Sequence, residues 1–190
     1  MTDFQPLGGT VLTLGRVVLE PLAEEHLEPL RTACAADQDV WEIYPVCMLG
    51  QHFDVSAAEL LLPASRPCFA IIDKKLSQVV GMTRYINPDP YGVVEIGNTY
   101  ISPAVRGIGF NNQLKRLMLD HAFACGYRKV EFRVDTRNKR SIAAVLKLGA
   151  QQEGVLRKNR VTWTGYQRDT AVFGLLREDW DDRERQSQQN

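Results

Sequence analysis

Two glycines, Gly107 and Gly109, stand between a strand-like run and a helical run, and this arrangement limits the fold more than any other feature. The run Val93–Ile101 has the β-branched character of a strand, and the positions after the glycines follow helical spacing. Gly126 stands where a helix C-cap belongs, and a second strand-like run, Lys129–Asp135, follows it directly. The sequence therefore predicts a β-loop-α-β unit that binds its ligand at the loop. The apolar positions of the helix are Leu114, Leu117, Met118, Ala122 and Cys125.

Three strand-like runs precede the loop, and their connections are short. They cover Cys68–Asp73, residues 79–86 and Val93–Ile101, which indicates an antiparallel meander. The predicted fold class is therefore α/β of the α+β type, with a mixed, mostly antiparallel central sheet flanked by helices. The other expected elements are a strand at 11–19, helices at 21–34 and 56–62, a helix from Asn138 or Ser141 to Leu148, strands near 151–157 and 170–176, and a polar segment at 178–190.

The length and composition are typical of one globular domain. The chain has 190 residues, of which 44% are hydrophobic and 24% charged. We expect one domain over residues 1–180, with a polar C-terminal tail at 181–190. No basic segment followed by an apolar run begins the chain, and no stretch approaches the roughly 18 apolar residues of a membrane span. We therefore expect a cytoplasmic protein without a membrane partner.

The four cysteines and the charge distribution narrow the choice of ligand. The cysteines are widely spaced and form no local cluster with histidines, so no metal site or disulfide framework is expected. The net charge of zero argues against a general nucleic-acid partner. Residues 1–95 hold 6 basic and 13 acidic side chains, whereas residues 96–190 hold 17 and 10. This asymmetry either favours an anionic ligand in the C-terminal half or reflects solvated faces.

The glycine loop has the features of a phosphate site. A helix N-terminus exposes unpaired N–H groups and the positive end of the helix dipole, so it can bind a diphosphate. Gly107 and Gly109 let the backbone approach such a ligand, and Arg106 adds a positive charge. Asn111 or Asn112 is expected to cap the helix. Glycines before a helix can also form a simple turn.

A dinucleotide site is the competing interpretation of the same loop. Gly107 and Gly109 follow a strand, and the next strand ends in Asp135, an acidic residue of the kind that binds a nicotinamide ribose. However, Asn112 occupies the third glycine position, and the preceding strands are predicted to be antiparallel. A nucleotide-dependent oxidoreductase is therefore disfavoured.

Several motifs in order resemble those of the GCN5-related N-acetyltransferase (GNAT) superfamily. They are EIGNTYISPAVRGIGFNN at 95–112, VEFRVD at 130–135, NKRS at 138–141 and KLGA at 147–150. Within the superfamily, the chain most resembles the branch of the ribosomal-protein alanine N-acetyltransferases RimJ and RimL. The matches VVLEPL at 17–22, EGVLR at 153–157 and RDT at 168–170 extend the likeness over nearly the whole chain.

The resemblance implies an acetyl-CoA site and assigns residues to it. The pyrophosphate signature maps to Arg106-x-x-Gly109-x-Asn111, where Asn replaces the usual Gly or Ala. The family fold has a strand that splays from its neighbour and pairs its backbone with the pantetheine arm. The residues assigned to the cofactor are Tyr100, Ile101, Arg106, Gly107, Ile108, Gly109, Phe110, Asn111, Asn138 and Ser141. Asn138 is also a residue type that is preferred at a helix N-cap.

Acyl transfer to an amine needs a proton acceptor for the substrate ammonium, and Glu95 is our candidate. Alternation places Glu95 on one face of its strand with Gly97, Thr99 and Ile101. The alternative is that Glu95 binds a substrate ammonium or ends the strand in solvent. Ser141 or Tyr100 is a candidate donor to the leaving thiolate. No metal is needed.

The amine acceptor is the least defined partner. Trp41, Tyr44, Phe53 and Tyr85 are candidate pocket residues, together with Glu95, although each aromatic side chain suits core packing equally well. The predicted function is an acetyl-CoA-dependent N-acetyltransferase that acts on a protein N-terminus, an amino acid or another small-molecule amine. A non-catalytic acyl-CoA-binding module is the alternative, and residues 37–67 are also compatible with a protein-interaction surface. The sequence does not distinguish a monomer from a homodimer.

The RimL-like branch has a second acidic residue after its Glu-Gly element. Arg160 occupies that position here, which argues against a ribosomal-protein acceptor.

Overall fold

The computed structural model describes residues 4–62 and 66–188 and contains one eight-stranded sheet. The strand order is β1-β2-β3-β4-β5-β6-β8-β7, and every neighbouring pair is antiparallel except β5 and β6. The predicted fold class is confirmed. The strands are β1 (Leu12–Leu14), β2 (Val17–Pro21), β3 (Cys68–Asp73), β4 (Gln78–Ile86), β5 (Val93–Ile101), β6 (Lys129–Asp135), β7 (Gln151–Val161) and β8 (Gln167–Leu176).

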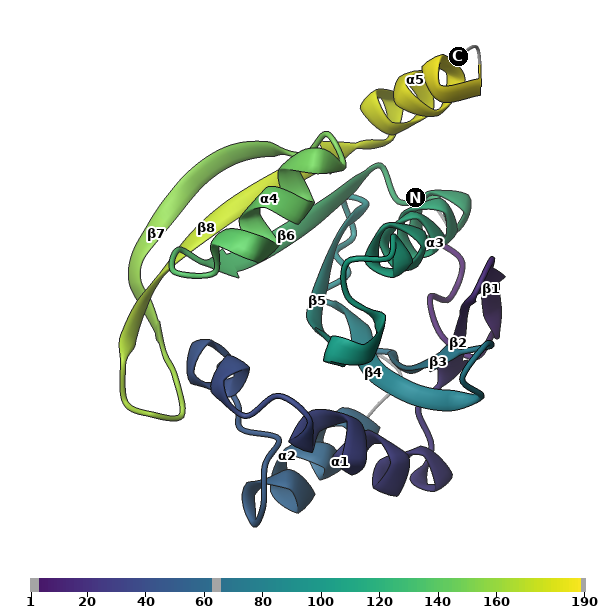
Figure 1. Ribbon diagram of the computed structural model, residues 1–190. Coiled ribbons are helices and arrows are strands. Elements are labelled where there is room, and N and C mark those ends of the chain that lie inside the picture. The colour runs from purple at the N-terminus through teal and green to yellow at the C-terminus, as the bar shows by residue number, and fades with distance from the viewer. Residues whose placement is uncertain (1–3, 63–65, 189–190) are drawn as a thin grey trace.

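Helices cover both faces of this sheet (Figure 1). They are the 3-10 turns η1 (Glu24–His26), η2 (Asp39–Ile43) and η3 (Pro103–Val105), and the α-helices α1 (Leu27–Ala35), α2 (His52–Leu61), α3 (Phe110–Ala124), α4 (Lys139–Lys147) and α5 (Arg177–Gln188). Buried side chains form one core cluster with α3 and α4 and a second cluster with α1, η2 and α2. Because one cluster lies on each face of the sheet, β3 and β4 are buried along almost their whole length.

Several boundaries differ from those expected: the helix expected at 21–34 is η1 followed by α1, and the helix expected at 56–62 is α2, which begins at His52. Residues 11–19 form a tight hairpin instead of one strand, because Gly15 turns the chain with a φ of +56°. The last two strands extend to Val161 and back from Gln167, so they form a longer hairpin than predicted. The segment expected to be a polar tail forms α5, where Trp180 is buried and donates to Asp120 Oδ1 at 2.8 Å. Residues 189–190 of that tail, and residues 63–65 of the 37–67 segment, lie outside the described residues.

Candidate active site

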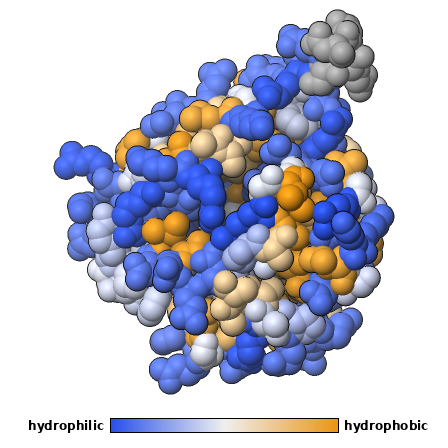
Figure 2. All heavy atoms as spheres, in the orientation of Figure 1, coloured by the Kyte–Doolittle hydropathy of each residue, from blue (hydrophilic) through white to orange (hydrophobic). Residues whose placement is uncertain are grey.

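The two parallel strands β5 and β6 separate soon after they meet, and a cavity lies between them. Their pairing covers only three residues of each strand and ends at Glu95 opposite Glu131. Beyond that point the β5 edge has no neighbouring strand among the described residues, so its backbone groups face the gap. A cavity of about 300 Å³ is lined there by β5, β6, α4, η2 and the glycine loop. The space-filling view shows the molecule hollowed near the centre of this face, between hydrophilic and hydrophobic side chains (Figure 2).

A β-bulge in β5 changes which side chains share a face. Gly97 pairs with Arg84 and Tyr100 pairs with Met82, so Asn98 and Thr99 lie opposite one residue of β4, and Asn98 has a φ of +47°. The extra residue reverses the alternation. The expectation that Glu95 and Gly97 share a face with Thr99 and Ile101 is therefore wrong. Consistent with this reversal, Ile96 and Ile101 join the core cluster beside α3, whereas Tyr100 joins the cluster beside α1.

The loop before α3 has the geometry of an anion site. Gly107 and Gly109 have φ values of +77° and +80°, and a Cβ added to either would meet no atom within 4 Å. The predicted cap at Asn111 or Asn112 is wrong: Gly109 is the N-cap, because its left-handed backbone starts the helix, and both asparagines lie in the first turn. The open space and the first-turn N–H groups fit a pyrophosphate. Gly107 and Asn111 line the cavity.

Arg106 fixes the start of this loop. Its guanidinium donates to the Ile101 carbonyl at 3.0 and 2.7 Å and forms an ion pair with Asp37. Part of its charge is therefore neutralised by the protein itself. Arg106 lines the cavity, whereas Ile108 is exposed outside it and Phe110 is buried in the core.

Glu95 lies in the wall of the cavity where β5 and β6 separate. The residue is buried, and its Oε2 lies 3.5 Å from Arg133 Nε, yet neither atom makes a hydrogen bond with a described residue. Burial raises the pKa of Glu95, although Arg133 and Arg160 act to lower it. A buried carboxylate in the wall of a cavity, with one oxygen that makes no hydrogen bond, is suited to accept a proton or to bind a cation.

The first turn of α4 supplies another wall. Asn138 caps this helix by accepting from the Ser141 N–H at 3.0 Å, which confirms its predicted capping role. Asn138 and Ser141 both line the cavity.

The predicted aromatic residues are divided between cavity and core. Tyr44 lines the cavity, and its hydroxyl donates to the Thr99 carbonyl at the bulge at 2.6 Å. Tyr100 is buried outside the cavity, where its hydroxyl donates to the Ala33 carbonyl at 2.7 Å. The three remaining aromatic residues are also buried in core clusters, so the structure does not bring them to the cavity. They are Trp41, Phe53 and Tyr85.

Several charged cavity residues were not assigned to the site from the sequence, among them Lys115, Arg133, Arg160 and Arg168. Lys115 is a charged residue within the apolar stripe of α3, and this unusual position could have identified it as a site residue. Arg133 alternates with the core residues of β6. Arg160 and Arg168 lie in the parts of the hairpin beyond the predicted strand ends, so their pairing across the hairpin was not predicted.

Comparisons with known proteins address the identity of the fold. The family model for the acetyltransferase (GNAT) domain matches residues 16–151. The chain belongs to the GNAT acetyltransferase family. No curated protein sequence matched the chain. No helix among residues 4–62 and 66–188 is long and apolar enough to cross a membrane, and the same residues hold no cluster of ligating side chains suited to a metal ion.

Solved structures of GNAT proteins resemble the chain over nearly its full length. A probable acetyltransferase of the GNAT family from Chromobacterium violaceum is 30% identical, with a TM-score of 0.88 and coverage of 95% of this chain and 93% of that chain. A GCN5-related N-acetyltransferase from Brucella melitensis is 26% identical, with a TM-score of 0.86 and coverage of 95% and 85%. A spermidine N-acetyltransferase from Vibrio cholerae, in complex with CoA and spermine, is 16% identical, with a TM-score of 0.72 and coverage of 87% and 98%, and shares the fold.

The left-handed loop predicts a specific effect of Gly109→Ala. The alanine is strained by about 1–2 kcal/mol at a φ of +80°, and the altered backbone should weaken acetyl-CoA binding roughly 10- to 100-fold by displacing N–H donors. Gly9→Ala is the matched control, since Gly9 has a φ of +82° and equally open surroundings but lies outside the cavity lining. Calorimetric titration and thermal melts check this result. Equal acetyl-CoA affinity in both variants would contradict the assigned loop.

Proposed function

We propose that this protein is an acetyl-CoA-dependent N-acetyltransferase that transfers the acetyl group directly from the thioester to a primary amine. The observation that carries the proposal is the position of Glu95 in the wall of the cavity that the glycine loop also borders. The Oε2 atom of this residue makes no hydrogen bond with a described residue. One cavity thus combines an anion site with a proton acceptor. Acetyl-CoA bound in it would supply the activated acyl group.

The residues of this chain have separable tasks in the proposed reaction. Gly107, Gly109 and the first turn of α3 would hold the pyrophosphate of acetyl-CoA, and the free edge of β5 would offer backbone groups to its pantetheine arm. Glu95 accepts the proton of the acceptor ammonium, directly or through water, so that a neutral amine attacks. Backbone N–H groups near the bulge at Asn98 would stabilise the oxyanion, and Ser141, which lines the cavity, would donate a proton to the leaving thiolate.

The acceptor amine is specified less closely than the reaction. The ordered motifs favour the RimJ/RimL-like branch, whereas Arg160, which lines the cavity, places a positive charge where that branch has an acidic residue. We therefore propose a protein N-terminus, an amino acid or another small amine as the acceptor class. The Vibrio cholerae enzyme that shares the fold acts on spermidine, which shows that this fold accommodates a small amine.

The proposed donor can be tested by thermal shift. Acetyl-CoA at about 100 times its Kd should stabilise the protein by about 2.7 kcal/mol, or roughly 5–11 °C for a chain of this size. NAD at the same concentration should leave the melting temperature unchanged. Release of free thiol from acetyl-CoA in the presence of amines then tests transfer. A shift with acetyl-CoA but no thiol release with any amine would favour a non-catalytic acyl-CoA-binding module, and no shift at all would refute the donor site.

A further inference from the structure

Three arginines from three neighbouring strands line the part of the cavity that contains Glu95. Arg133 comes from β6, Arg168 from β8 and Arg160 from β7. Arg160 and Arg168 are direct partners across the β7–β8 hairpin, so two like charges face each other. Such a pair is destabilising unless an opposite charge joins it. Glu95 experiences the charges of all three arginines, which places them around the proposed proton acceptor.

The carboxylates nearby form no ion pair with Arg160 or Arg168, although the charges of Asp135 and Glu95 act on Arg168. Asp135 accepts two hydrogen bonds from Arg137, at 3.1 and 2.8 Å, and Glu131 pairs with Lys129 and Arg133. Arg133 is also the only cation within ion-pair distance of Glu95 among the described residues. Two positive charges therefore remain without an ion-pair partner in the described structure.

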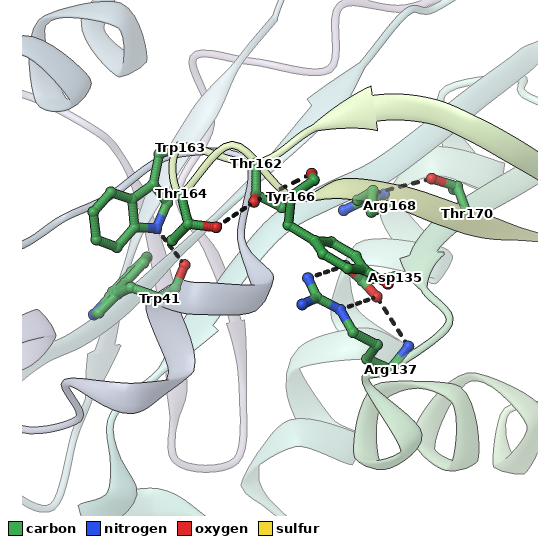
Figure 3. Close-up of polar contacts among 9 residues, drawn as sticks. All are labelled: Trp41, Asp135, Arg137, Thr162, Trp163, Thr164, Tyr166, Arg168 and Thr170. Atoms are coloured by element: carbon green, nitrogen blue, oxygen red, sulfur yellow. Dashed lines mark hydrogen bonds and ion pairs between the residues drawn. The ribbon is translucent and has the colours of Figure 1, made fainter.

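Arg168 and Arg160 are these two remaining charges. Arg168 is 5% exposed, and the one hydrogen bond from its side chain to a described residue goes from Nε to Thr170 Oγ1 at 3.0 Å (Figure 3). Arg160 is exposed on β7, and its side chain makes no hydrogen bond or ion pair with any described residue. Burying an arginine such as Arg168 is costly unless a partner binds its guanidinium, and a carboxylate matches the fork of that group in both residues.

We propose that the acceptor is an amine that carries a carboxylate, held by Arg160 and Arg168 while its amino group lies at Glu95. The inference rests on the proposed acetyltransferase function and specifies its substrate class. Such a zwitterionic acceptor places a negative charge at the two arginines that lack an ion pair and its ammonium at Glu95, whose Oε2 makes no hydrogen bond. A polycation such as a polyamine offers no group for the arginines, so it should bind poorly.

Two contacts attach the β7–β8 hairpin, which carries Arg160 and Arg168, to other segments of the protein. At the tip of the β7–β8 hairpin, Trp163 Nε1 donates to the Trp41 carbonyl of η2 at 2.7 Å, and the Tyr166 ring lies 3.8 Å from the Arg137 guanidinium (Figure 3). The hairpin that carries both arginines is thus fixed against the segment that contains Tyr44. The glycine loop lies on a different element, at the start of α3. The arginine cluster is therefore available to the acceptor while the loop binds the CoA pyrophosphate.

Paired amines test this assignment. Thiol release is measured with the twenty L-amino acids, with their α-carboxamides and with spermidine, in the wild type and in Arg160→Gln. The best amino acid should exceed its own amide in kcat/KM by about 10- to 100-fold, and Arg160→Gln should reduce this ratio to near one. Arg157→Gln is the matched control, because Arg157 lies on the same strand outside the cavity lining. It should keep the wild-type ratio.

A binding measurement keeps the test independent of turnover. N-acetyl amino acids should raise the melting temperature of the CoA complex, whereas their amides should not, and Arg160→Gln should abolish the difference. Equal or better use of amides or spermidine would overturn the proposal, as would the absence of any carboxylate-dependent shift. Loss of the acetyl-CoA shift itself in Arg160→Gln would instead assign the arginine to a CoA phosphate. Failure of the acetyltransferase function is distinguished by the wild type, which would then release no thiol with any amine, including the amides and spermidine.

Discussion

Replacing Glu95 with glutamine should lower kcat by about 10²- to 10⁴-fold, the range expected when a general base is removed. The substitution keeps the size of the side chain and removes its charge and its capacity to accept a proton. Glu95 Oε2 makes no hydrogen bond with a described residue, so the internal contact that glutamine weakens is the 3.5 Å ion pair with Arg133 Nε. The fold and the binding of acetyl-CoA should therefore persist. Single-turnover and steady-state thiol release, together with acetyl-CoA titration, measure the three quantities separately.

The pH profile separates proton transfer from simple charge attraction. Since burial raises the pKa of Glu95, wild-type kcat/KM should fall with decreasing pH around a midpoint above the ordinary glutamate value. Glu95→Gln should lack this acid limb. Glu153→Gln is the control, because Glu153 is paired with Lys129 outside the cavity lining. If Glu95→Gln raised KM alone and kept the acid limb, Glu95 would be a binding residue for the ammonium and not the base.

Local sequence pattern predicted the bounds of three central strands well. The bounds of β3, β5 and β6 agree with the expected runs, because β-branched residues and short connections define them. The hairpin of β7 and β8 was predicted too short. Each of its strands departs from simple alternation, since the pairing register shifts twice and β7 is exposed on both faces. No regular alternation of buried and exposed residues therefore marks the length of the β7–β8 hairpin in the sequence.

The site was predicted only where a motif is continuous in sequence. The loop around Gly107 and Gly109 is such a motif, and the structure gives both residues the left-handed backbone that requires glycine. Glu95 was found on its strand, but its neighbours on that face were not, because the bulge at Asn98 has no distinctive sequence signal. Arg160 and Arg168 become partners only through the hairpin register, which is a property of the folded sheet.

The second large effect is expected at Lys115 and concerns the stability of the folded protein. Lys115 is buried. Its Nζ donates to Thr99 Oγ1 at 2.9 Å and lies 5.5 Å from the centre of the Phe132 ring. No carboxylate pairs with it among the described residues. Burial lowers the pKa of Lys115 to about 7. The gap from the ordinary value of about 10.4 corresponds to an unfavourable contribution on the order of 4 kcal/mol near neutral pH.

Lys115→Met should therefore stabilise the protein at pH 7 by about 2–3 kcal/mol, after the loss of the hydrogen bond and the ring contact is subtracted. Below a pH of about 7 the wild type carries the full unfavourable contribution, because folding must bury the charged amine or remove its proton. Between about pH 7 and 10 the unfolded chain binds more protons than the folded one, so wild-type stability rises with pH relative to the variant. Urea unfolding at pH 6, 7, 8 and 9 should show the difference between the two proteins shrinking. Lys139→Met, at an exposed position of α4, should show no such trend. A stability difference independent of pH would mean that Lys115 remains charged in the folded protein, held by groups that compensate its burial.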